Sequence, residues 1–457
     1  MTEHDQYRFS ALDGNCRKMA AGWLKLAILT LLIAGVYAAL LALARTPVLK
    51  DLVPSNDFFY VSLVIHVIFS NLFWFLAIAG MLWSLNTRNY AIVLGWTALL
   101  ITTLGVLVVA ISPFAGAGDP VMSNYIPFLD SPVFFTGLAI AGVGFALLVV
   151  RTLIAVPVMR LRTRVGSIRF AVYTATNAAT MAVLAFFWAF LTMPGINRGK
   201  TDYEGLFWLG GHVLQFTHAL LMLVSWMWLA SASGIRLKLP ARVTALLFTL
   251  ALLAVAFTPI AFLSVSVNSA NFLQWFTNQM RVGGVAATLP IGLLVLWSLF
   301  GANRPDSTAR PLRVALLLSI LLFALGGIMG YWLEQGSTLV TAHYHSVTGA
   351  VTLAFMALVY DVLPKLGFCT VARRLALLQV YAYGIGQLLH VLGLAWAGGY
   401  GMQRKVAGSA EVLNNVGQTW GMALMGLGGL IATIGGILFL YLVIKALRQP
   451  QLSGSAS

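Results

Sequence analysis

Residues 339–364 read LVTAHYHSVTGAVTLAFMALVYDVLP, and this stretch decides the fold of the chain. It contains one charged residue, Asp361, which lies close to its end. About 20 apolar residues suffice for a helix to cross the ~30 Å hydrocarbon core of a bilayer, so the stretch predicts a membrane-spanning helix. It also carries His343 and His345, and titratable rings inside a membrane are costly and usually functional.

The composition of the whole chain resembles that of this stretch. Of the 457 residues, 60% are hydrophobic and 9% are charged, whereas a soluble protein carries about 25% charged residues. The composition therefore excludes an ordinary soluble protein. The length accommodates about a dozen spans with short connections and leaves no room for a sizeable soluble domain.

Twelve apolar runs predict an all-α, polytopic membrane protein with twelve transmembrane helices. The runs lie at 21–45, 58–84, 91–113, 132–157, 169–193, 205–233, 242–266, 272–300, 312–333, 339–364, 376–398 and 413–446. Each is long enough to span a bilayer. The predicted organisation is an N-terminal tail at 1–20, a membrane domain at 21–446 and a C-terminal tail at 447–457.

Basic residues are unevenly divided between the two sides of the predicted bundle. Alternate loops and both ends of the chain hold most of the Lys and Arg, whereas 114–131, on the other side, holds none. Because cytoplasmic loops are enriched in these residues, both termini are predicted to be cytoplasmic. The same clustering accounts for the net charge of +15 without a nucleic-acid partner. Cys16 and Cys369 fall on the cytoplasmic side and are expected to be free thiols.

Six of the seven histidines fall inside predicted spans, and their depths are informative. At a rise of about 1.5 Å per residue, five of them lie in the outer third of the bilayer; these are His66, His212, His343, His345 and His390. Imidazoles from four helices at one level indicate a layer of metal or haem ligands. For His218, near the midplane, and for His390, we favour a hydrogen-bonded histidine in the packed bundle.

The spacing of His343 and His345 separates their roles. Residues i and i+2 of a helix point about 200° apart, so the two rings leave opposite faces of the same helix. One helix can then ligate two different haem irons, one on each side. The alternative is a pair of histidines bonded to carbonyl groups.

Several motifs resemble subunit I of the haem–copper oxidase and nitric oxide reductase superfamily, and the resemblance covers most of the chain. The motifs are Trp208-Leu-Gly-Gly-His212, Ala342-His343-Tyr-His345-Ser-Val-Thr-Gly-Ala-Val, Leu389-His390-Val-Leu-Gly-Leu and Gly401-Met-Gln-Arg404-Lys405. The resemblance implies a haem-binding domain in the bacterial inner membrane.

The resemblance also implies roles for individual residues. His66 and His345 would be the two axial ligands of a low-spin haem, and His343 would be the single protein ligand of a high-spin haem. Both haems are expected to be b-type. Arg404 and Lys405 would neutralise haem propionates, and ordinary loop charges are the alternative.

The chain departs from the family pattern at the second metal. His212 matches one of the usual ligands, but the seventh predicted span contains no histidine. A tight copper site needs about three nitrogen ligands, so a second metal, copper or iron, is left without its usual ligand set. The remaining candidates are weak ligands or hydrogen-bond donors: Asn268, Asn271, Asn278 and Gln279.

A second departure bears on the substrate. Oxygen-reducing members commonly carry a tyrosine four residues after the span-six histidine, where this chain has Phe216. Nitric oxide reduction needs two electrons and no phenol, although the glutamates typical of nitric oxide reductases are also missing. The span interiors offer almost no titratable relay, so we expect no proton pumping and proton uptake from the outer side.

These observations favour the catalytic subunit of a membrane terminal reductase, with nitric oxide preferred over oxygen. Its electrons would come from a separate cytochrome c or cupredoxin-like subunit on the outer face. The alternatives are an oxygen reductase with an atypical active site and a non-catalytic haem protein for electron transfer or gas sensing. A transporter without haem would leave the histidines at one depth unexplained.

Overall fold

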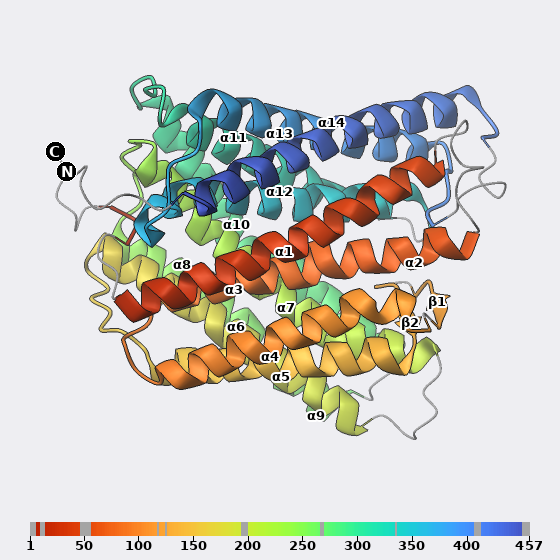
Figure 1. Ribbon diagram of the computed structural model, residues 1–457, viewed down its shortest axis with the longest axis horizontal. Helices are drawn as coiled ribbons and strands as arrows, with labels where there is room; N and C mark the ends of the chain where they lie inside the picture. Colours follow the sequence, from red (N-terminus) through yellow and green to blue (C-terminus); the bar gives the residue numbers. More distant parts are fainter. Residues whose placement is uncertain are drawn as a thin grey trace. The chain divides into compact units, whose positions relative to one another are not determined.

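The computed structural model describes residues 6–9, 14–45, 56–116, 118–123, 126–192, 200–265, 269–333, 336–405 and 413–449. Among these residues, twelve helices are long and apolar enough to cross a membrane, which confirms the expected all-α fold with twelve spans (Figure 1). Cys16 and Cys369 are thiols that form no disulfide in the described part of the chain, as expected. The orientation of the termini remains a prediction.

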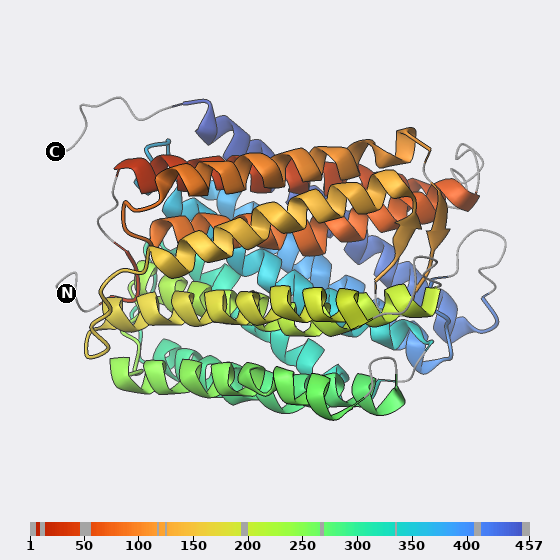
Figure 2. The ribbon, with the colours of Figure 1, turned by 90° about the horizontal axis from the view of Figure 1, so that it is seen from below.

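The helices are α1 (Gly14–Arg45), α2 (Asn56–Val67), α3 (Trp74–Leu85), α4 (Ile92–Ile111), α5 (Pro132–Ile154), α6 (Arg164–Thr192), α7 (Lys200–Ala232), α8 (Ala241–Ala256), α9 (Thr258–Ser264), α10 (Ala270–Phe300), α11 (Arg310–Met329), α12 (Thr338–Val362), α13 (Arg373–Gly399) and α14 (Val416–Leu447). A π-helical turn, η3 (Ile68–Phe73), joins α2 to α3, and short 3-10 turns, η4 (Ser112–Phe114) and η5 (Pro364–Leu366), follow α4 and α12. Strands β1 (Asp119–Val121) and β2 (Phe128–Asp130) form an antiparallel pair between α4 and α5 (Figure 2).

The chain forms two compact units, each described by itself. Unit 1 comprises Met1–Ala27, Phe73–Ser231 and Ile235–Ala302. Unit 2 comprises Ile28–Leu72, Ala232–Gly234 and Asn303–Ser457. His212 and His218 therefore belong to unit 1, and the other four intramembrane histidines belong to unit 2.

In unit 1 a buried arginine connects three elements. Arg151, near the end of α5, is fully buried. It donates to Thr87 Oγ1 at 2.5 Å and to the Arg88 carbonyl at 3.3 Å, both just after α3, and its Nη2 lies 3.8 Å from Cys16 Sγ of α1. A buried charge without such partners would be strongly destabilising, so these contacts fix the ends of the three helices together.

The segment before α1 is also packed into unit 1. Tyr7 and Phe9 are fully buried. The Tyr7 hydroxyl donates to the Leu239 carbonyl at 2.6 Å and lies 2.9 Å from Thr244 Oγ1 of α8. The Phe9 ring meets Trp228 of α7 edge to face, with centroids 5.1 Å apart. These contacts anchor residues 6–9 to the ends of α7 and α8.

In unit 2 the antiparallel pair α13 and α14 packs with backbone against backbone (Figure 1). A Cβ added at Gly421, Gly428 or Gly435 would lie 2.6, 2.2 or 2.5 Å from the backbone nitrogen of Ala397, His390 or Tyr383, respectively. Small residues permit such close approach between membrane helices. These glycines of the last span therefore serve helix packing, and the seven-residue spacing on both helices defines the register of the pair.

Candidate functional site

His343 is held by a main-chain carbonyl of the preceding span. Its Nδ1 lies 2.7 Å from the Gly326 oxygen of α11. Because a carbonyl oxygen only accepts, Nδ1 carries the proton, and the lone pair of the neutral ring is on Nε2. This is the tautomer that a metal-ligating histidine uses when its other nitrogen is oriented by a carbonyl.

Gly330 makes room for the His343 ring. A Cβ at this position would lie 3.0 Å from His343 Cε1 and 3.1 Å from Nδ1. The end of α11 thus contacts His343 through its backbone. Apart from the small residues Gly326, Gly327 and Gly330, nothing in the sequence predicted this contact.

His345 contacts the next span, α13. Its ring centroid lies 4.9 Å from that of His390, with the planes inclined at 63°. His390 is itself oriented by α14, since its Nδ1 lies 3.0 Å from the Met425 carbonyl. This bond fits the interpretation of His390 as a hydrogen-bonded histidine of the bundle. Within unit 2, α12 therefore presents His343 toward α11 and His345 toward α13, as their spacing indicates.

His66 lies in the last turn of α2, directly before the π-helical turn η3. Its Nδ1 lies 3.0 Å from the Ala34 carbonyl of α1, so the lone pair is again on Nε2. The His66 carbonyl accepts from Ser70 Oγ at 2.7 Å, within the same irregular stretch. Single π-helical turns inside α-helices are frequent at functional sites. The sequence did not predict this one.

His212 in unit 1 shows the same arrangement within a single helix. Its Nδ1 lies 2.8 Å from the Trp208 carbonyl, and the two rings stack with centroids 4.8 Å apart. His218, six residues later, packs edge to face on Phe75 with centroids 4.9 Å apart. Its buried Nε2 has no hydrogen-bond partner among the described residues. We expected a hydrogen-bonded histidine in the packed bundle here. Nε2 does not make such a bond within the described part of the chain, and the ring packs on an aromatic side chain instead.

Arg404 and Lys405 lie in a loop that is fixed to the start of α12. The Arg404 amide donates to the Gly336 carbonyl, and the Thr338 amide donates to the Met402 carbonyl, both at 2.9 Å. Lys405 adopts a left-handed backbone with φ of 59°. His343 lies five residues after Thr338, or about 8 Å along the helix. Both basic residues therefore lie at the same end of unit 2 as His343 and His345, which are near the start of α12.

The side chains proposed for a second metal differ in their burial and in their contacts. No group of three or more His, Cys, Asp or Glu side chains in the described parts of the chain could hold a metal ion. Gln279 donates to the Ala254 carbonyl at 2.8 Å and to Thr258 Oγ1 at 3.0 Å, so its amide connects α10 to α8 and α9. Asn271 and Asn278 are exposed. Asn268 lies outside the described residues.

The donor chemistry of unit 2 fits iron porphyrins. His66 and His343 are each oriented through Nδ1 by a backbone carbonyl, and this leaves the lone pair of each ring on Nε2, the atom that would ligate iron. His345 lies on the opposite face of the helix from His343, and the cations of the Arg404 loop suit propionates. These residues could hold two haems, whereas no comparable set is present for a second metal among the described residues.

Comparison with known proteins identifies the family. Residues 18–438 match the family model described as cytochrome c and quinol oxidase polypeptide I. The chain belongs to this family. Its members are haem–copper oxidoreductases, so the chain is a subunit I-like transmembrane protein of that superfamily, and the resemblance in the motifs is confirmed.

Relatives of this oxidase polypeptide I chain include two uncharacterised proteins. One, from Rickettsia prowazekii (strain Madrid E), is 29% identical over 94% of this chain and 96% of its own length. The other, from Aquifex aeolicus (strain VF5), is 30% identical over 76% of this chain and 85% of its own length. A structure described as a heme-copper terminal oxidase dimer superposes with a TM-score of 0.74 at 14% identity, covering 96% of this chain and 85% of that one. That likeness concerns the fold.

Proposed function

We propose that this protein is the catalytic, haem-binding subunit of a non-pumping terminal reductase of the bacterial inner membrane, with nitric oxide as its preferred substrate. The observation that carries the proposal is the arrangement on α12. His343 is fixed to α11 through the Gly326 carbonyl, and His345 contacts His390 on the other side of the helix. One helix can then ligate two irons of different coordination.

The histidines of unit 2 would ligate two b-type haems. His66 and His345 would provide both axial nitrogens of one haem, and His343 would provide the single protein ligand of the other. When bound, such haems supply a saturated iron that passes electrons and an iron with an open position for a diatomic gas. Arg404 and Lys405 would orient the propionates by charge-assisted hydrogen bonds.

Two features of unit 1 support nitric oxide over oxygen. Phe216 is buried, and it stands four residues after His212, so a hydrocarbon ring occupies the position where the family's oxygen reductases commonly carry a phenol. His212 has no histidine partners in α8 or α9 with which to hold copper. Four-electron cleavage of oxygen would lack a phenol donor here, whereas a two-electron reduction needs none.

The supply of protons and electrons follows from the residues that the spans carry. Asp361, at the end of α12, forms an ion pair with Lys365 rather than a relay into the membrane. With so few titratable groups in the span interiors, protons would enter from the outer side without being pumped. Electrons would come from a separate cytochrome c or cupredoxin-like subunit on the outer face.

Turnover of the purified protein with an artificial electron donor tests this proposal. We expect two molecules of nitric oxide, two electrons and two protons to yield one nitrous oxide and one water, faster than oxygen is consumed. His343→Ala should abolish the reaction. Gly426→Ala, where an added Cβ meets nothing within 4 Å, should retain it.

The other outcomes discriminate between the alternatives. Faster consumption of oxygen than of nitric oxide would contradict the substrate and favour an atypical oxygen reductase. Haem-loaded protein that consumes neither gas would contradict catalysis and favour a haem protein for electron transfer or gas sensing. Outward proton release during turnover in vesicles would refute the absence of pumping.

A further inference from the structure

Two cations lie level with each other at the end of the α13–α14 pair. The register set by Gly421, Gly428 and Gly435 places Lys445 of α14 beside Arg373, the first residue of α13. The bond from the Cys369 amide to the Gln449 carbonyl, at 3.1 Å, shows that the same register continues past both helix ends. Like charges at such a place repel each other unless an anion lies between them.

A cavity of about 360 Å³ lies between these two cations in unit 2. Its polar lining includes Arg373, Lys445, Tyr441, Thr370 and Gln449, and no acidic residue contributes to it. The Lys445 ammonium lies 5.9 Å from the Tyr441 ring centroid. The cavity therefore presents positive charge and hydrogen-bond donors to an occupant.

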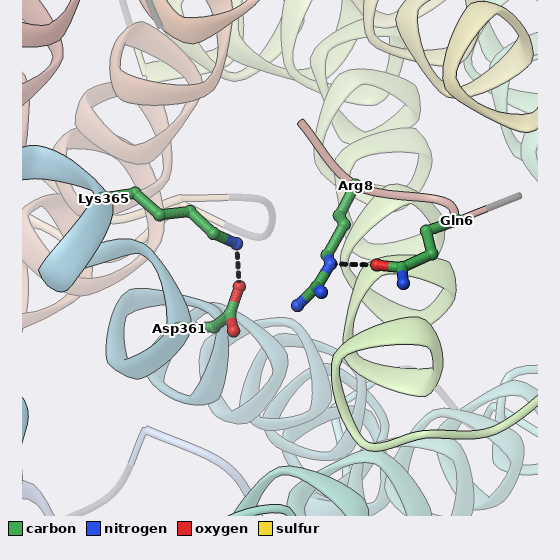
Figure 3. A network of polar contacts seen from close by, with 4 residues as sticks. All are labelled: Gln6, Arg8, Asp361 and Lys365. Carbon is green, nitrogen blue, oxygen red and sulfur yellow. Dashed lines mark hydrogen bonds and ion pairs between the residues drawn. The ribbon is translucent and has the colours of Figure 1, made fainter. Parts of the chain in front are cut away.

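The acidic groups described at this end of unit 2 are already engaged. Asp361 is paired with Lys365 (Figure 3). Asp306 accepts from the Thr308 hydroxyl at 2.7 Å and from the Ala309 amide at 2.7 Å, and it also attracts Arg373. This end of unit 2 carries five other basic residues: Arg304, Arg310, Arg313, Arg374 and Arg448. The surface around the cavity therefore carries a large excess of positive charge.

The cavity opens beside an apolar strip on the same two helices. Leu375 and Leu378 of α13 and Ile434, Ile437 and Tyr441 of α14 are all exposed by more than a third of their surface. Because both helices are long and apolar enough to span a membrane, we expect this strip to face hydrocarbon and the cavity at their ends to lie at the level of the headgroups. Tyrosine is enriched at that level.

We propose that this cavity binds the phosphate headgroup of an anionic glycerophospholipid, whose acyl chains lie along the apolar strip. Arg373 and Lys445 hold the phosphate between them, and the Tyr441 ring lies at the junction of headgroup and chain. The N-terminus of α13, where Ala372 provides no side-chain cap, adds its partial positive charge. The site is independent of the haem ligands.

Native mass spectrometry of the delipidated protein, supplied with phosphatidylglycerol or phosphatidylcholine, tests the proposal. We expect one phosphatidylglycerol to bind more tightly than phosphatidylcholine. In the double variant Arg373→Gln/Lys445→Gln the affinity for phosphatidylglycerol should fall on the order of tenfold, since each basic residue near a membrane surface contributes to anionic lipid binding. Inorganic phosphate at millimolar concentration should not displace the lipid.

Two further variants distinguish a defined lipid site from a general effect of surface charge. Arg374→Gln/Arg448→Gln removes the same charge at the same end of the helix pair, outside the cavity lining, and should retain the lipid. The exchange Arg373→Lys/Lys445→Arg keeps both charges and should also retain it, even if the double glutamine variant is unstable. Equal loss in the Arg374/Arg448 control would overturn a defined site, and so would undiminished binding in the double glutamine variant. Displacement by phosphate alone would overturn the lipid as occupant.

Discussion

At the scale of single residues, main-chain carbonyls decide what the histidines can do. The carbonyls of Ala34, Trp208, Gly326 and Met425 lie 2.7 to 3.0 Å from the Nδ1 atoms of His66, His212, His343 and His390. Because each carbonyl accepts a hydrogen bond from Nδ1, it selects the histidine tautomer whose lone pair is on Nε2. The sequence predicts which histidines are candidate ligands, because imidazoles inside membrane spans are costly and rare. It could not predict the carbonyls, since their positions depend on how neighbouring helices pack.

Substitution of Gly330 tests the fixed position of His343. In Gly330→Ala the new Cβ would lie 3.0 Å from the His343 ring, so the ring must shift by a few tenths of an ångström, which disturbs its bond to the Gly326 carbonyl. We expect a cost of about 1–3 kcal/mol in stability and a weakened carbon monoxide difference spectrum of the His343 haem. Gly327→Ala, whose Cβ meets nothing within 4 Å, is the control. Equal effects of the two variants would contradict the assigned contact.

The stability of the packed N-terminal segment around Tyr7 depends on pH. Burial raises the pKa of the Tyr7 hydroxyl above its usual value of about 10, and the bond to Thr244 opposes this only in part. The folded segment thus favours the neutral phenol. The contribution of the Tyr7 hydroxyl to stability is complete below pH ~10, and it is lost as the pH rises through the pKa of this hydroxyl in the folded protein.

Cleavage by trypsin after Arg8 reports on this anchor. Tyr7→Phe loses the bonds to Leu239 and Thr244, about 1 kcal/mol, so cleavage should be roughly fivefold faster at pH 8. The difference from the unsubstituted chain should shrink as the pH rises above 10. Tyr90→Phe, at an exposed ring, corrects for the protease's own pH dependence. A difference that stays constant with pH would contradict the role of the phenol. Arg8 itself is in contact with Gln6 (Figure 3).

At the scale of elements, hydrophobic runs predicted the spans because length and composition alone decide whether a helix can cross a bilayer. Two irregularities were missed. The run at 58–84 contains the π-helical turn η3, and the run at 242–266 divides into α8 and α9 at Phe257. Pro259, in the first turn of α9, is a local signal that could have predicted the division. The π-helical turn has no such signal, since it depends on tertiary packing.

The backbone contact between α13 and α14 predicts a strong position effect. In Gly428→Ala the added Cβ would lie 2.2 Å from the His390 nitrogen, so the helices must separate. We expect a loss of about 2 kcal/mol or more, because backbone atoms cannot move aside as a side chain can. Gly426→Ala on the same helix should change stability by less than about 0.5 kcal/mol. Thermal unfolding in detergent measures both, and equal losses would contradict the register of the pair.

At the scale of the whole molecule, the charge pattern predicts that both termini are cytoplasmic. A green fluorescent protein fused after residue 457 should fluoresce in cells, because it folds in the cytoplasm. Alkaline phosphatase fused at the same point should be inactive, and it should be active when inserted between α4 and α5. The reverse pattern would invert the assigned sides of every loop and move the histidine layer to the inner leaflet.

The central claim is that histidines of unit 2 bind two haems of different coordination. The most direct measurement is the haem content of the purified protein together with its reduced-minus-oxidised and carbon monoxide spectra. We expect two haems, of which one binds carbon monoxide. His66→Ala or His345→Ala should remove the low-spin signal, and His343→Ala should remove the carbon monoxide-binding signal alone. A colourless protein, or spectra unchanged by all three substitutions, would contradict the account.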